Sequence, residues 1–127
     1  MSHFSTIKTK LKDRDALLKA LLVMGLPVDV NKELENPVGH EHAKVHCDIT
    51  LGTDIGFRWN RNTESYELVT DIQTWNHPVP PKRMIDKITQ EYATEIITRE
   101  VKKKGFEVEK KVNSLENKVE ILATRWV

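Results

Sequence analysis

The densest group of side chains that could do chemistry lies between His40 and Cys47. It holds three histidines and a cysteine within eight positions, and imidazole and thiolate are the ligands that Zn²⁺ prefers. In a strand, however, His46 and Cys47 point to opposite faces, and His42 lies about 13 Å from His46. We therefore expect no metal ion and no cofactor, but a solvated loop followed by a structural cysteine.

Cys47 could also act as a nucleophile, which requires a base on its own face of the strand and some exposure. The alternation of Val45, Cys47, Ile49 and Leu51 with polar residues instead places the thiol among apolar side chains that face the core. An inert core thiol is the prediction.

Any other catalytic site would have to be assembled from residues that lie far apart in the sequence. The candidates are Asp54, Arg58, Glu67 and either His3 or His77. Their spacing gives no reason to converge, and Arg58 can simply pair with Glu67 across a hairpin, which contributes about 0.2 to 1 kcal/mol at an exposed site. We therefore expect that the protein is not an enzyme.

Residues 58–61 have a composition that could bind nucleic acid, because Trp59 lies between two arginines, and residues 102–104 add three lysines. Trp59 shares its strand face with Ile55 and Phe57, which favours burial in the core. Twenty basic against nineteen acidic side chains give a formal net charge of +1. This charge balance argues against a nucleic-acid partner.

Large aromatic side chains outside the periodic segments favour the binding of another protein, because tryptophan is enriched at interface hot spots. Trp75 lies beside His77 in a proline-rich segment, and Trp126 is near the end of the chain. Each tryptophan could equally cover one end of the sheet. The predicted partner surface comprises Arg58, Trp75, His77 and Trp126.

The elements that must position these residues follow from periodicity. Residues 4–11 alternate as a strand, and a helix is expected from the N-cap Asp13 to the stop at Gly25. An edge strand through Val28, a loop over residues 36–42 and three strands between residues 44 and 72 follow. Prolines in residues 76–81 form a rigid connector, and Pro80 or Pro81 opens a helix that spans residues 84–101. A hairpin ends the chain.

These elements predict an α+β fold with a largely antiparallel sheet of about six to seven strands and two helices on one face. A helix that ends in glycine before a strand occurs twice, at Gly25 and Gly105. The repeat indicates either a pseudo-duplicated strand-helix-strand unit or chance, because glycine commonly ends helices. The length of 127 residues fits one domain, residues 1–127.

Composition restricts the class of protein further. Hydrophobic residues make up 39% and charged residues 31% of the chain, and no apolar run approaches the roughly 20 residues of a membrane span. The first residues lack the features of a secretory signal, and the single cysteine cannot form an internal disulfide. The expected location is the cytoplasm.

Five blocks carry a resemblance to a known family: residues 1–9 (MSHFSTIKT), 54–58 (DIGFR), 66–69 (YELV), 101–106 (VKKKGF) and 125–127 (RWV). They are similar, in the same order, to the hypothetical chloroplast reading frame thirty-five family of cyanobacteria, algal plastids and bacteriophages of cyanobacteria. The resemblance implies a domain of unknown function with no catalytic residues to carry over. It also implies a location in cyanobacterial cytoplasm, plastid stroma or, for a phage-encoded member, infected host cytoplasm.

The leading prediction is therefore a small non-catalytic accessory or adaptor protein that binds another protein. The alternative is a small-molecule or nucleic-acid-binding domain, which would need a concave pocket with a few polar groups rather than a flatter apolar patch. Edge strands at residues 28–32 or in the terminal hairpin also allow a homo-oligomer.

Overall fold

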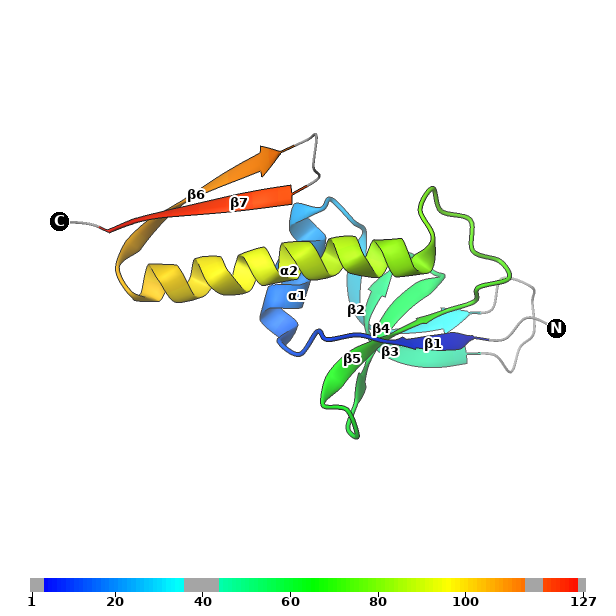
Figure 1. Cartoon of the computed structure of the whole chain (residues 1–127). Coiled ribbons are helices and arrows are strands. Elements are labelled where there is room, and N and C mark those ends of the chain that lie inside the picture. The colour runs from blue at the N-terminus through cyan, green and yellow to red at the C-terminus, as the bar shows by residue number, and fades with distance from the viewer. Residues whose placement is uncertain (1–3, 36–43, 114–117, 126–127) are drawn as a thin grey trace.

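The structure is a computed structural model that describes residues 4–35, 44–113 and 118–125, with the backbone alone from residue 106 onward (Figure 1). Its elements are β1 (Ser5–Lys8), α1 (Arg14–Val23), β2 (Val28–Glu35), β3 (Lys44–Leu51), β4 (Ile55–Asn60), β5 (Ser65–Thr70), α2 (Pro81–Lys103), β6 (Phe106–Asn113) and β7 (Lys118–Arg125). The strand predicted over residues 4–11 is shorter in the structure, where β1 covers Ser5–Lys8. The loop predicted over residues 36–42 lies outside the described residues.

Five strands form one antiparallel sheet in the order β1-β5-β4-β3-β2. Ile7 pairs with Leu68, Leu68 with Phe57, and Phe57 with Ile49, so a single apolar row crosses four strands. This arrangement confirms the predicted α+β class and the antiparallel pairing.

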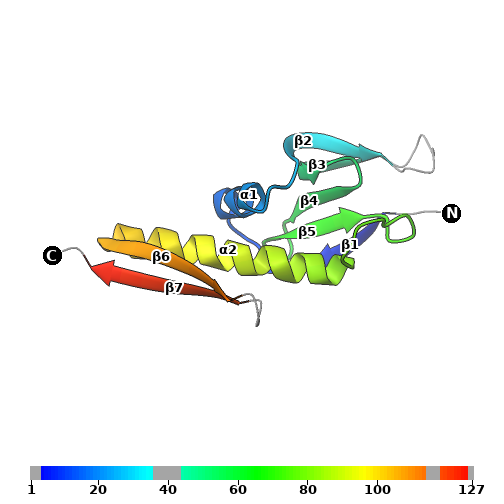
Figure 2. The ribbon, with the colours of Figure 1, turned by 90° about the horizontal axis from the view of Figure 1, so that it is seen from above.

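The predicted sheet of six to seven strands is wrong in its count, because β6 and β7 pair only with each other among the described strands. The cause is the length of α2, which carries the chain beyond the sheet. The β6–β7 hairpin then runs back along the C-terminal half of α2 (Figures 1 and 2).

Both helices pack on the same face of the sheet, as expected. Leu17 and Leu21 of α1 and Ile88 of α2 form one fully buried core with Phe57 and Leu68. Removing this apolar area from water is the main source of stability in the fold, about 25 cal/mol for each Å² buried.

A second, smaller cluster on the opposite face of the sheet contains Cys47, with Leu34 and Val69. A Cβ atom at Gly56 would lie 2.4 Å from the Cys47 sulfur, and the neighbours of Gly56 face the main core. The expectation that Cys47 shares a face with Ile49 is therefore wrong. We attribute the reversal to a kink of the paired strands at Asn31, whose φ of 53° is left-handed.

The two glycines of the sequence repeat end their helices in the same conformation, with φ of 73° at Gly25 and 82° at Gly105. The strands that follow them differ, because β2 joins the five-stranded sheet whereas β6 does not. Pro81 is the first residue of α2, which confirms the predicted helix start. No helix among the described residues is long and apolar enough to cross a membrane.

Candidate functional site

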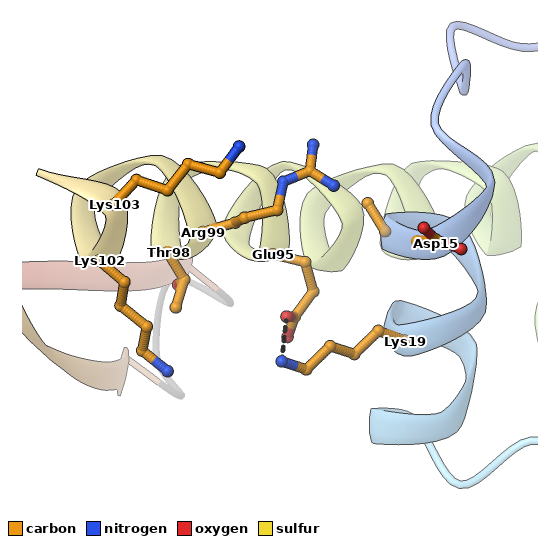
Figure 3. Close-up of a pocket in the computed structure, with 8 residues that line it drawn as sticks. Asp15, Lys19, Glu95, Thr98, Arg99, Lys102 and Lys103 are labelled. Carbon is orange, nitrogen blue, oxygen red and sulfur yellow. Dashed lines mark ion pairs between the residues drawn. The ribbon is translucent and has the colours of Figure 1, made fainter.

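A pocket of about 450 Å³ lies between α1 and the C-terminal half of α2 (Figure 3). Its lining consists of four basic residues, two acidic residues, one alanine and one threonine: Lys19, Arg99, Lys102, Lys103, Asp15, Glu95, Ala16 and Thr98. The pocket lies on the C-terminal half of α2, which extends beyond the sheet and runs beside α1 and the β6–β7 hairpin (Figure 1).

Asp13 positions the α1 wall of the pocket. One oxygen of its carboxylate accepts a hydrogen bond from the Ala16 N–H at 3.0 Å and caps α1, and the other accepts from the Arg99 guanidinium at 2.7 Å. The Asp13 N–H donates to the Tyr92 hydroxyl at 2.8 Å. Arg99 and the Ala16 N–H together hold the pKa of Asp13 below its ordinary value of 3.8. The start of α1 is thus fixed to α2 at two points.

Glu95 provides a buried charge on the α2 wall, with 4% of its surface exposed. Its carboxylate lies 3.4 Å from the Lys19 ammonium, and this pair crosses the pocket in Figure 3. Thr98, one turn further along α2, is 5% exposed, and its hydroxyl has no hydrogen-bond partner among the described residues. A buried hydroxyl of this kind is available to a ligand.

An exposed apolar surface continues the pocket along α1. Spacings of three and four residues place four side chains on one side of α1: Asp15, Lys19, Leu22 and Val23. Leu22 is 63% exposed and Val23 is 57% exposed. The combined surface offers cations that outnumber carboxylates, together with an apolar strip, which suits a ligand that is both acidic and apolar.

The residues predicted from the sequence as a partner surface lie elsewhere. Arg58 donates to one Glu67 oxygen at 2.9 and 2.7 Å, which confirms the pairing expected across the β4–β5 hairpin. Trp126, like His3, lies outside the described residues. The use of Arg58 and Trp126 in a partner surface stays a prediction.

Trp75 and His77 fasten the proline-rich connector to the body of the protein. The Trp75 indole N–H donates to the Val79 carbonyl at 2.9 Å, and its ring packs against the main core. The His77 ring lies against Trp75 and forms a 2.7 Å contact with the Asp54 carboxylate. Asp54 and His77 thus form one pair, separate from the pair of Arg58 and Glu67. Their use in a partner surface also stays a prediction.

The histidine and cysteine segment is described only from residue 44 onward, so His40 and His42 lie outside the described residues. His46 is exposed and Cys47 is fully buried, as their opposite orientations predict. Burial raises the pKa of the Cys47 thiol to about 11, which keeps it protonated at neutral pH. Within the described ranges, no three His, Cys, Asp or Glu side chains are grouped to hold a metal.

The predicted burial of Trp59 in the core is wrong. The residue is 39% exposed, because it lies near the end of β4, where the β4–β5 hairpin extends past both helices in Figure 1. Its ring meets Tyr66 edge-on at 5.1 Å between centroids. The periodicity correctly places Trp59 on the face of Phe57, but it does not show where the helices that cover this face end.

The helix pocket was not predicted from the sequence. Asp13 and Arg99, which hold its walls together, are 86 positions apart. Two signals were present locally: the capping aspartate before α1 and the cations of residues 102–104 at the end of α2. Neither signal shows that the two segments meet.

The fold and the pocket define a small antiparallel α+β protein with a charged pocket between two helices. Residues 20–122, most of the chain, match the family described as protein of unknown function (DUF1257). The chain therefore belongs to this family.

Several relatives share nearly the whole length of the chain. The uncharacterized protein ycf35 of Pyropia yezoensis is 35% identical, and the match covers 99% of this chain and 98% of the relative. The proteins of the same name in Guillardia theta and Cyanophora paradoxa are 31% and 28% identical, with the same coverage. These matches confirm the resemblance to the hypothetical chloroplast reading frame thirty-five family. No solved structure matches the chain.

Proposed function

We propose that the protein is a non-catalytic accessory protein that binds another protein, and that it takes an acidic, partly apolar segment of this partner between α1 and α2. The observation that carries the proposal is the gathering of four basic side chains around one pocket, beside the exposed Leu22 and Val23. We also propose a location in cyanobacterial cytoplasm or plastid stroma, or in infected host cytoplasm if the protein is phage-encoded, and the plastid-encoded ycf35 relatives support a plastid setting.

Charge complementarity supports an acidic partner. Of the two carboxylates that line the pocket, the buried Glu95 is paired with Lys19, and Asp15 is exposed at the start of α1. Arg99 is paired with Asp13, which lies outside the lining. Lys102 forms no ion pair with the described side chains, and a partner carboxylate can therefore approach it without displacing a carboxylate of this chain. Such charges mainly set association rate and specificity.

The apolar strip supports a macromolecular partner rather than a free anion. Leu22 and Val23 are γ-branched and β-branched side chains that are more than half exposed. Their burial against a partner would contribute more to affinity than the rim charges, because affinity at most interfaces comes mainly from the removal of apolar surface from water. A free small anion would not cover them.

The test is affinity purification of tagged protein from cells that encode a family member, followed by binding measurements with the purified partner. The Leu22→Asp/Lys102→Glu variant changes the pocket and its strip. The Ile72→Asp/Lys82→Glu variant makes the same chemical changes at exposed residues elsewhere.

We expect one stoichiometric protein partner with the wild type and with the control variant, and at least about a tenfold weaker complex with the pocket variant. Binding should also weaken as salt rises. Retention of the partner by the pocket variant, or its equal loss from both variants, would contradict the proposal. Recovery of a small molecule in place of a protein would also contradict it.

A further inference from the structure

A second hollow opens where β3 and β4 separate. The pairs between these strands run from Leu51↔Ile55 to Ile49↔Phe57, and at the next step the Asp48 carboxylate accepts a hydrogen bond from the Trp59 N–H at 2.8 Å. The hollow has a volume of about 580 Å³. Its lining is formed by residues of both strands and of the turn after β4: Lys44, Val45, His46, Asp48, Arg58, Trp59 and Arg61.

The charge of this hollow is mainly positive. Its lining holds three cations, Lys44, Arg58 and Arg61, and one carboxylate, that of Asp48, one of whose oxygens is already used by the backbone of β4. Arg58 gives its Nε and one terminal nitrogen to Glu67, and its side chain is still 41% exposed. The remaining guanidinium donors can therefore bond to an incoming anion.

Trp59 gives this hollow a feature that the helix pocket lacks. Its side chain is exposed, and its contact with Tyr66, which is only 5% exposed, restricts the orientation of the indole. An exposed and oriented indole among cations is the arrangement on which proteins stack unpaired bases while they bind phosphates. Val45 adds a half-buried apolar surface to the same wall.

We propose that the hollow between β3 and β4 binds single-stranded nucleic acid, with Trp59 stacking on a base and Arg58 and Arg61 contacting phosphates. A single strand fits better than a duplex because a base must be unstacked from its neighbours to lie against an indole. The ligand class differs from that of the helix pocket, which has cations but no aromatic side chain. The two proposals rest on different residues and stand independently.

The experiment is fluorescence anisotropy of a labelled oligothymidylate of about twelve nucleotides, titrated with the full chain between about 50 and 200 mM salt. Trp59→Ala should weaken binding about fivefold or more, and Trp59→Phe should retain part of the affinity. Arg61→Ala should lower the slope of log affinity against log salt by about 0.7, the value for one phosphate contact on a single strand.

Two controls separate this site from general charge effects. Arg83→Ala removes an exposed arginine from α2, and Lys102→Glu alters the helix pocket, and both variants should bind the oligonucleotide as the wild type does. Circular dichroism of each variant checks that it folds. The proposal is overturned if the wild type does not bind, if Trp59→Ala and Arg61→Ala bind unchanged, if either control weakens binding equally, or if a duplex competes as well as the single strand.

Discussion

Asp13 shows how one side chain can serve local and long-range structure together. Its role as a helix cap follows from its place before Ala16, Leu17 and the helical spacing beyond, so it could be predicted. Its hydrogen bond with Arg99 could not be predicted, because the sequence around Asp13 does not indicate which distant cation will lie next to it. The neighbouring guanidinium and the Ala16 N–H lower the pKa of the carboxyl in the folded protein.

Replacing Asp13 with alanine is expected to reduce the free energy of unfolding by about 1 to 2 kcal/mol near neutral pH, since a cap and a charged partner are lost. The folded pKa lies below the unfolded value, so the contribution is complete above about pH 4 and is lost as the pH falls through the folded pKa. Urea unfolding at several pH values measures this. Asp86→Ala, at an exposed site on α2, should change stability by less than about 0.5 kcal/mol. An effect of Asp13→Ala that is equally large at pH 2 would be inconsistent with this account.

Gly56 packs against the side chain of Cys47 in the second core, which leaves no room for a side chain at position 56. A Cβ atom there would lie 2.4 Å from the Cys47 sulfur and 2.9 Å from its Cβ. Gly56→Ala should therefore cost about 1 to 3 kcal/mol in urea unfolding. In a double-mutant cycle, Cys47→Ala should recover part of this cost, and the two substitutions should not be additive. If the two changes in unfolding free energy are strictly additive, the side chains at positions 56 and 47 are not in steric conflict.

At the scale of elements, local periodicity predicted β3, β4, β5 and α2 because each element carries its own repeat of apolar residues. The prolines before Lys82 also marked the start of α2, since Pro81 fits the first helical position. The side of the sheet on which Cys47 lies could not be predicted. The β2–β3 ladder is interrupted next to Cys47, where Asn31 is left-handed and has no partner in the ladder, and alternation within β3 alone does not contain that information.

The connector between β5 and α2 is expected to depend on His77 for its order. His77→Ala removes the contact with Asp54 and the ring contact with Trp75, both at partly exposed sites. Global stability should fall by less than about 1 kcal/mol, whereas amide hydrogen exchange in residues 72–80 should become faster. His46→Ala, at the exposed histidine of β3, is the matched control and should leave exchange in the connector unchanged. Unaltered exchange in His77→Ala would show that the prolines alone order this segment.

At the scale of the whole molecule, the predicted class and the single helical face are confirmed. The helix pocket could not have been located in advance, whereas Arg58, Trp59 and Arg61 of the strand hollow stood out by composition but not by their surroundings. The helix pocket depends on the approach of Lys19 to Glu95, and the strand hollow depends on where β3 and β4 separate. The first is set by how far α2 extends beyond the sheet, and the second by how far the β4–β5 hairpin extends past the two helices (Figure 1). Sequence periodicity indicates which segments form helices and strands, but it says little about how far one of them extends past its neighbours.

The separate position of the β6–β7 hairpin has a consequence for the order of folding events. The hairpin packs along α2 and shares no ladder with the five-stranded sheet among the described strands. The sheet and its helices can therefore form the transition state for folding before the hairpin docks.

Glu109→Pro, which removes a donor from β6 opposite Leu122, should raise the unfolding rate constant and leave the refolding rate constant within about twofold. Arg58→Pro in the central strand β4 should slow refolding instead. Chevron plots of both variants distinguish these outcomes, and slow refolding of Glu109→Pro would place the hairpin inside the folding nucleus. The β6–β7 hairpin would then dock late in folding, and its main effect would be on the lifetime of the folded state.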